Sequence, residues 1–194
     1  MRYLYLILTL LTLTACEPPK LPSPFHASEV GEKYAQADFM LTDHNGNVRT
    51  LADFRGKIVL LFFGYTHCPD VCPTTMADQA QVMDLLGKDA DKVQVLFVTI
   101  DPERDTQALL SQYVPAFDAR FLGLWGDAQA TAQVAKAFNV VYLKQPTKSS
   151  YNMDHSAGTF LIDPQGKVRL LTPFAQKPEW MVEDIRLLLA LPAH

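Results

Sequence analysis

The segment Ile58–Phe63 is apolar at every position, so it has no polar face. A strand has this pattern when both of its sides are covered, as in a parallel sheet with helices on each face. Val93–Ile100 is also rich in apolar residues. We therefore predict two buried strands in succession, with a helix between them.

Three segments place apolar residues at helical spacing. In the first, the residues that share one face are Met76, Ala80, Met83 and Leu86. In the second, Asp127–Phe138, the residues expected to face inward are Ala128, Ala132, Ala135 and Phe138. In the third, Pro178–Leu189, they are Met181, Ile185 and Leu188. A shorter helix is predicted for Asp105–Tyr113, ending before Pro115.

Two pairs of short strands are predicted to form hairpins. Phe39–Thr42 and Val48–Leu51 flank an Asn-Gly pair, which favours a tight turn. Thr159–Ile162 and Val168–Leu171 flank Asp-Pro-Gln-Gly, a sequence typical of a type I turn. Each pair is therefore expected to lie antiparallel.

The order of these elements predicts the class of fold. Further short strands are expected at Phe121–Leu124 and Val140–Leu143, and the polar residues 145–154 are expected to form a loop. Alternating strands and helices with a closing hairpin indicate an α/β sandwich. A redox-type cysteine motif directly after the first buried strand favours its thioredoxin-like member. We predict a central mixed sheet with helices on both faces and an N-terminal hairpin.

The composition of the chain excludes some classes of function. The chain has 194 residues and a net charge of −4, so it lacks the basic excess of a nucleic-acid-binding protein. It contains no Gly-x-Gly-x-x-Gly and no Walker loop, so no nucleotide site is expected. A core of this size needs no disulfide for stability. The three cysteines therefore require another explanation.

The N-terminus is expected to be a membrane anchor. Residues 1–15 have one cation and an apolar run too short to span a bilayer, as in a signal peptide. The run ends in Leu-Thr-Ala-Cys, which resembles the bacterial lipobox, and this implies cleavage before Cys16 and attachment of lipid to its sulfur. The alternative is an ordinary secretory peptide.

We interpret residues 1–15 as a lipoprotein signal peptide, 16–35 as a proline-rich tether and 36–194 as the folded domain. The protein would then face the periplasm, or the outer face of the cell membrane.

Cys68 and Cys72 follow the first buried strand and lie where the next helix begins. The partial positive charge of a helix N-terminus favours thiolate over thiol. Three residues separate the pair, whereas redox enzymes of this fold usually have two. The pair could close as a disulfide or chelate a soft ion. Copper(I) accepts two or three soft ligands, whereas structural zinc needs four.

His155 is the candidate third ligand, because it lies just before the strand Thr159–Ile162. In thioredoxin-like proteins a cis-proline loop precedes that strand and faces the cysteine pair. Ala157 stands about where that proline would fall. Two aspartates are candidates for supporting roles. Asp154 could orient the histidine ring, and Asp101 lies at the end of the second buried strand.

Three motifs together resemble the Sco/SenC family. They are residues 64–73 (GYTHCPDVCP), residues 101–106 (DPERDT) and residues 154–156 (DHS). The resemblance implies a membrane-tethered, thioredoxin-like protein that helps to assemble cytochrome c oxidase. It also implies that Cys68, Cys72 and His155 ligate copper, as Cu(I) or Cu(II), with one ion per chain.

Two functions follow from this resemblance. A copper chaperone would deliver its ion to the dinuclear copper site of oxidase subunit two. A thiol–disulfide oxidoreductase would instead reduce the cysteines of that or another periplasmic partner. We favour the chaperone, and hence a protein that is not an enzyme, because a reductase needs neither His155 nor the wide cysteine spacing. A periplasmic thiol reductant, a copper donor or both are expected as further partners.

Overall fold

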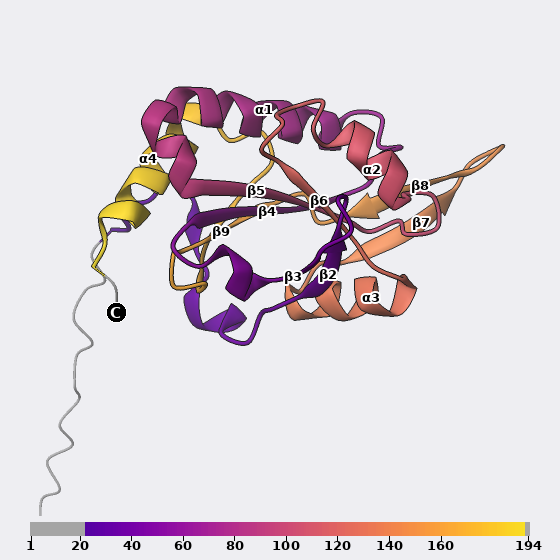
Figure 1. The fold of residues 1–194 in the computed structure, drawn as a ribbon, viewed down its shortest axis with the longest axis horizontal. Helices are drawn as coiled ribbons and strands as arrows, with labels where there is room; N and C mark the ends of the chain where they lie inside the picture. Colours follow the sequence, from indigo (N-terminus) through magenta and orange to yellow (C-terminus); the bar gives the residue numbers. More distant parts are fainter. Residues whose placement is uncertain (1–21, 193–194) are drawn as a thin grey trace, which may run out of the picture.

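The computed structural model describes residues 22–192, which form a mixed sheet between helices (Figure 1). The sheet has eight strands in the order β1-β10-β9-β4-β5-β6-β2-β3. In chain order these strands are β1 (Ser28–Glu29), β2 (Met40–Asp43), β3 (Val48–Thr50), β4 (Ile58–Gly64), β5 (Val93–Thr99), β6 (Leu122–Trp125), β9 (Thr159–Ile162) and β10 (Val168–Thr172). The predicted thioredoxin-like α/β sandwich is confirmed.

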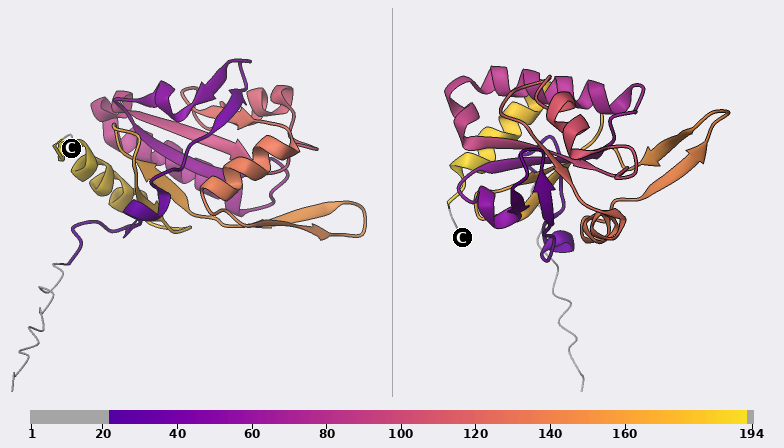
Figure 2. Two further views of the ribbon diagram at one scale, coloured as in Figure 1. Left: turned by 90° about the horizontal axis from the view of Figure 1, so that it is seen from below. Right: turned by 45° about the vertical axis from the view of Figure 1, so that its right-hand side comes forward.

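Four α-helices cover the sheet. They are α1 (Val71–Leu86), α2 (Gln107–Tyr113), α3 (Ala128–Ala137) and α4 (Pro178–Ala190). Helices α1, α2 and α4 lie on one side of the sheet and α3 lies on the other (Figures 1 and 2). Among residues 22–192, no helix is both long and apolar enough to cross a membrane.

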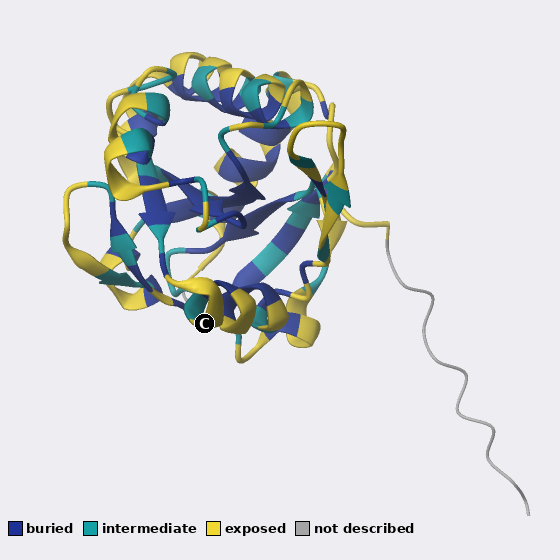
Figure 3. Ribbon diagram, turned by 90° about the vertical axis from the view of Figure 1, so that its right-hand side faces the viewer, coloured by how far each residue is buried: buried dark blue, intermediate teal, exposed yellow. Residues whose placement is uncertain are grey.

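Strand β4 lies at the centre of the molecule. All seven of its residues are buried, and it pairs with β5 in parallel and with β9 in antiparallel fashion. Figure 3 shows the middle of the sheet buried, while the outer faces of the helices are exposed. Since β4 and β5 are parallel, the loops that follow them meet at one edge of the sheet. The Ile100 amide donates to the Gly64 carbonyl at 2.9 Å and joins these two loops.

The two predicted hairpins are present and share one turn chemistry. In each, the aspartate at the start of the turn accepts hydrogen bonds at 2.8–3.0 Å from the backbone amides two and four residues later. The aspartates are Asp43 and Asp163. Each turn also contains a glycine with positive φ, 90° at Gly46 and 73° at Gly166. The Asn-Gly and Pro-x-Gly sequences therefore specify turns that the buried carboxylates hold closed.

The prediction of a loop at 145–154 is wrong. These residues contribute to a hairpin of β7 (Tyr142–Pro146) and β8 (Tyr151–His155), a separate two-stranded sheet that projects from the body (Figure 2). Most of its residues are exposed or half-buried. The hairpin therefore lacks the apolar alternation by which a strand packed on a core is recognised.

The predicted inward face of α3 is also partly wrong. Ala128 and Ala132 are exposed, whereas Thr131 and Val134 are buried. Alanine has so little side-chain area that either face of an Ala-rich helix can contact water at small cost. The larger Val134 therefore decides which face packs on the sheet.

The folded domain begins earlier than predicted. Ala27 is buried and β1 pairs with β10, although residues 27–35 were assigned to the tether. The amides of His26 and Ala27 donate to the two carboxylate oxygens of Asp184 on α4, at 2.8 and 2.9 Å. Those hydrogen bonds attach the chain to the domain directly after the proline-rich segment. The predicted signal peptide, Cys16 and the tether as far as residue 21 lie outside the described residues.

We expect Asp184→Ala to destabilise the protein by about 1–3 kcal/mol, because it leaves two backbone donors without a partner. Asp184 is fully buried. Urea unfolding of the reduced protein measures the change. The matched control is Glu183→Ala. It removes a 2.7 Å contact with the His26 ring at a position where the Glu183 side chain is 60% exposed, and it should cost less than about 1 kcal/mol. Equal losses in the two variants would contradict this account.

Candidate metal centre

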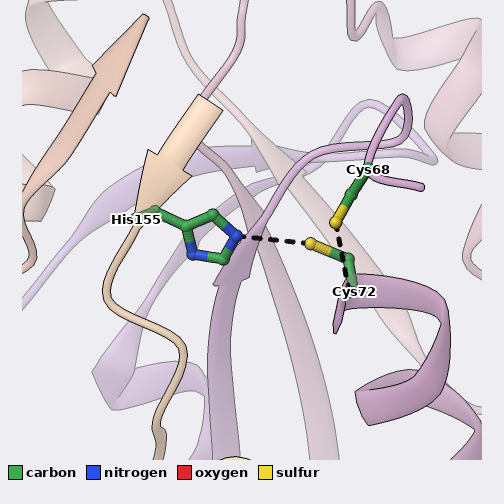
Figure 4. Close-up of side chains that lie close together, drawn as sticks. All are labelled: Cys68, Cys72 and His155. Carbon is green, nitrogen blue, oxygen red and sulfur yellow. Dashed lines mark hydrogen bonds between the residues drawn. The ribbon is translucent and has the colours of Figure 1, made fainter. Parts of the chain in front are cut away.

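Three side chains from separate parts of the fold converge beside the end of β4. Cys68 lies in the loop between β4 and α1, Cys72 lies in the first turn of α1, and His155 is the last residue of β8. Their sulfur and nitrogen atoms all lie within 4.8 Å of one another (Figure 4). The sequence prediction that these three residues meet is therefore matched by the geometry.

A buried carboxylate holds the cysteine loop in place. Asp105 is fully buried and accepts hydrogen bonds from the Thr66 amide at 3.0 Å and the Thr66 hydroxyl at 2.6 Å. The Thr99 hydroxyl at the end of β5 donates to the same carboxylate at 2.7 Å. At the other end of the loop, the Cys72 amide donates to the Cys68 sulfur at 3.3 Å. Sequence reasoning treated Asp105 only as the start of a helix and missed this role.

The imidazole of His155 points its Nε2 atom at the cysteines. Nε2 lies 3.4 Å from the Cys72 sulfur, and Nδ1 lies 3.0 Å from the Ser156 carbonyl oxygen. A carbonyl can only accept, so Nδ1 carries the hydrogen and the lone pair of Nε2 faces the sulfurs. The rings of Tyr65 and Phe62 meet the imidazole edge-to-face, with centroids 6.0 and 6.1 Å away. The ring is thus already oriented for ligation through Nε2.

Burial keeps two of the three groups uncharged. Cys72 is fully buried, and desolvation raises the pKa of its thiol far above its usual value. Desolvation likewise lowers the pKa of His155, so its imidazole is neutral at pH 7. The expectation that the helix N-terminus would favour a thiolate is wrong for Cys72, because desolvation by burial raises the pKa of its thiol. A cation that displaces the thiol proton would remove this penalty.

The site opens to solvent through one pocket. It has a volume of about 410 Å³, and Cys68 and His155 are part of its wall. The other residues that line it are Tyr65, Pro69, Asp70, Val71, Asn152, Met153, Asp154 and Ala157. Cys72 does not line the pocket, since it lies beneath the surface. An incoming ion or protein would therefore meet Cys68 and His155 before Cys72.

The donor set fits a soft metal ion. Ligand atoms that bind one first-row ion at about 2.0–2.3 Å are about 3.5–4 Å apart. The Cys72 sulfur and the His155 Nε2 atom are 3.4 Å apart, and all three ligand atoms lie within 4.8 Å of one another, so a bound ion would need only small movements of the side chains. Two sulfurs and one imidazole nitrogen match the preferences of copper, and the described residues offer no fourth Cys, His, Asp or Glu in the cluster for structural zinc.

The two aspartates with predicted supporting roles lie in different places. Asp154 accepts a hydrogen bond from Gln145 at 2.7 Å, and the ring of His155 is held by the Ser156 carbonyl instead. The orienting contact expected of Asp154 is therefore made by the Ser156 carbonyl. Asp101 is buried and bonds to Tyr151 of β8 at 2.8 Å, so it contacts the strand that carries His155.

Other sulfur and imidazole groups nearby do not join the cluster. Met76 lies on α1 and is fully buried in the hydrophobic core. The His67 ring lies 3.0 Å from the Thr66 hydroxyl and 3.7 Å from the Asp105 carboxylate. Both residues thus have structural surroundings.

The chain resembles proteins of one family over most of its length. The SCO1/SenC family model matches residues 27–190. The mitochondrial SCO2 homolog of Bos taurus is 43% identical over 155 residues, which are 78% of this chain and 58% of that protein. The chain spans between 48% and 61% of the length of four vertebrate SCO2 homologs that it matches.

Solved structures show the same fold. ScoI of Bradyrhizobium japonicum, determined with copper bound, is 42% identical, with a TM-score of 0.72 over 77% of this chain and 96% of that one. BsSco, described as a member of the Sco family of cytochrome c oxidase assembly proteins, has a TM-score of 0.67 over 86% of this chain and 98% of that one. At 20% identity, this second likeness shows the fold alone.

We expect the reduced, metal-free protein to lose stability as the pH rises above about 9, the ordinary pKa of the Cys72 thiol. Above that pH the unfolded chain releases a proton that the folded protein retains. The free energy of unfolding should then fall by about 1.4 kcal/mol per pH unit. Urea unfolding between pH 8.5 and 10 measures the slope. Cys72→Ala should have a shallower slope, and an equal slope would show that Cys72 ionises normally in the fold.

Proposed function

The chain belongs to the SCO1/SenC family, and from this premise we propose that it binds copper in the service of cytochrome c oxidase assembly. The observation that carries the proposal is the cluster of Cys68, Cys72 and His155, whose ligand atoms lie within 4.8 Å of one another. The copper-bound structure of the 42% identical ScoI supports the choice of metal.

Cys68, Cys72 and His155 would hold one ion per chain. Two thiolates suit copper(I), and the neutral imidazole adds the nitrogen that copper(II) favours. Binding would release the proton of the buried Cys72 thiol, because a coordinating thiol is deprotonated. The charge of the ion then offsets the cost of a buried thiolate. The same site would thus accept either oxidation state.

The pocket supports a role in transfer. Cys68 and His155 line its wall, so the ligands of a partner could reach the ion from that side while Cys72 still holds it from below. Such an arrangement permits ligands to be exchanged one at a time. We propose that the recipient is the dinuclear copper site of oxidase subunit two.

The second candidate is a thiol–disulfide oxidoreductase. The observation in its favour is the unequal exposure of the two cysteines, both of them free thiols. Cys68, in the pocket, would attack a partner disulfide, and the buried Cys72 would resolve the mixed disulfide, so that two electrons and two protons pass to the partner. Only the chaperone requires His155. A partner-reduction assay of His155→Ala therefore separates the two functions.

We further propose that lipid on Cys16 anchors the domain to a membrane, facing the periplasm or the outer side of the cell. Residues 17–25 separate Cys16 from the first residue held by Asp184. A proline-rich chain rises about 3.1 Å per residue, so these nine residues reach about 28 Å. The anchor would keep the domain close to a membrane-embedded oxidase.

Anaerobic titration of the reduced protein should show one tightly bound copper(I) per chain. Cys68→Ser and Cys72→Ser should each abolish tight binding, because each removes a thiolate. His155→Ala should keep copper(I) but weaken copper(II) by about 100-fold or more, beyond the roughly 10–100-fold typical of residues that only support a ligand. Loss of the thiolate-to-copper(II) absorption band reports the change.

The matched control for the histidine variant is His67→Ala, which removes the neighbouring imidazole and should leave both affinities unchanged. One equivalent of tightly bound copper(I) in a variant lacking both Cys68 and Cys72 would overturn the assignment.

Cys16→Ser should move the protein from the membrane fraction to the soluble fraction, because it removes the sulfur that carries the lipid. The copper affinity of this variant should not change. Fractionation of cells followed by mass spectrometry of the N-terminus measures both the location and the lipid. Cys68→Ser is the control and should remain in the membrane fraction. A Cys16→Ser protein that stays membrane-bound would refute the lipid anchor.

A further inference from the structure

The hairpin of β7 and β8 projects from the body, although it carries one of the three candidate ligands (Figures 1 and 2). A strand that stands away from the core needs specific contacts to hold a side chain in one place. At the His155 end, the imidazole Nε2 lies 3.4 Å from the Cys72 sulfur. The remaining side-chain hydrogen bonds between hairpin and body that the structure describes involve the loop that follows β5, at residues 101–104.

Three residues of this contact form a closed ring of interactions, which we call the clasp: Asp101, Arg104 and Tyr151. Arg104 donates from Nε to the Asp101 carboxylate at 2.6 Å and from Nη1 to the Tyr151 carbonyl at 2.9 Å. The Tyr151 hydroxyl donates to the other Asp101 oxygen at 2.8 Å. The guanidinium also lies over the Tyr151 ring, 3.7 Å from its centroid.

The polar centre of the clasp is largely shielded from water, although Tyr151 is only half-buried. Asp101 is 1% exposed, and the side chain of Arg104 is 18% exposed. Burial and the hydrogen bond to Asp101 raise the pKa of Tyr151 to about 12, so its hydroxyl stays a donor at neutral pH. The neighbouring pair of Lys144 and Glu103 is exposed, at 44% and 61%, and contributes little by comparison.

The clasp and His155 lie at opposite ends of β8. Tyr151 is its first residue and His155 its last. At the His155 end, the Ser156 amide donates to the Val141 carbonyl at 3.0 Å, which closes the base of the hairpin. The clasp thus holds the first residue of β8 against the body, and the bond to Val141 ties the other end of the strand to the start of β7. Together these contacts limit the direction of β8, and with it that of the His155 side chain.

We propose that Asp101, Arg104 and Tyr151 are positioning residues, which hold β8 so that the imidazole of His155 faces the two cysteines before any metal arrives. This inference rests on the proposed copper site. The clasp contacts the strand of His155, whereas the cysteines belong to a different loop held by Asp105. Its loss should therefore affect the binding of the two copper oxidation states differently. Loosening the clasp should weaken copper(II), which needs the imidazole, and spare copper(I), which the two thiolates hold.

The test compares Tyr151→Phe and Arg104→Ala with the unaltered protein. Tyr151→Phe keeps the aromatic ring and removes only the hydroxyl, so it remains informative if Arg104→Ala fails to fold with Asp101 buried and unpaired. We expect the copper(II) affinity, measured with the metal salt and the charge-transfer band, to fall about 10–100-fold in each folded variant. The copper(I) affinity should stay within about threefold. Lys148→Ala, in the exposed turn of the same hairpin, is the control and should change neither.

A second background shows whether the clasp acts through His155. In a His155→Ala protein, adding Tyr151→Phe should cause no further loss of copper(II) affinity, because the ligand that the clasp positions is already gone. An equal loss in both backgrounds would overturn the proposal. So would unchanged copper(II) binding in the folded clasp variants, or a parallel loss of copper(I), which would indicate general damage to the fold.

Hydrogen exchange of the metal-free protein separates this inference from the proposed function. Tyr151→Phe should speed hydrogen exchange of the backbone amides at 152–156 by about tenfold, the factor expected when one hydrogen bond is lost. The exchange rates of the α1 amides should not change. If His155→Ala alone left copper(II) binding unchanged, the proposed copper site would be wrong, whereas the exchange result would still report on the clasp. Unchanged exchange in Tyr151→Phe would overturn the clasp itself.

Discussion

The burial of β4 on both faces is the constraint on which the rest of the structure depends. Because all seven of its residues are covered, its chain can reach solvent only at its ends, and its carboxyl end is where the cysteine loop begins. The parallel neighbour β5 delivers a second loop to the same edge. The inner side of the site therefore adjoins the buried core, and the resulting desolvation explains why Cys72 remains a neutral thiol and His155 a neutral base.

Two carboxylates from the loop after β5 organise the two halves of the site. Asp105 holds the loop of Cys68, and Asp101 holds the hairpin of His155. The cysteines and the histidine come from distant parts of the chain, yet the segments that carry them are bonded to the same short turn, at residues 101–105. Neither carboxylate is itself a member of the cluster.

The sequence predicted the elements that carry strong apolar patterns or special turn residues. The strand Ile58–Phe63, both turns and the convergence of Cys68, Cys72 and His155 could be predicted because each has a local signal or a place in the fold. The hairpin around residues 145–154 could not, since its strands are stabilised by the buried Asp101 contact rather than by an apolar face. The same holds for Asp184, whose partners at 26 and 27 lie more than 150 residues away in sequence.

The N-terminal segment joins the domain at one end, and this position decides which end of the domain stays free for a partner. His26 and Ala27 are fastened to α4, at the end of the domain away from the projecting hairpin (Figures 1 and 2). An attachment at the N-terminus would therefore join the domain at the end opposite the pocket. A large partner could then reach the cysteines from the free end of the domain.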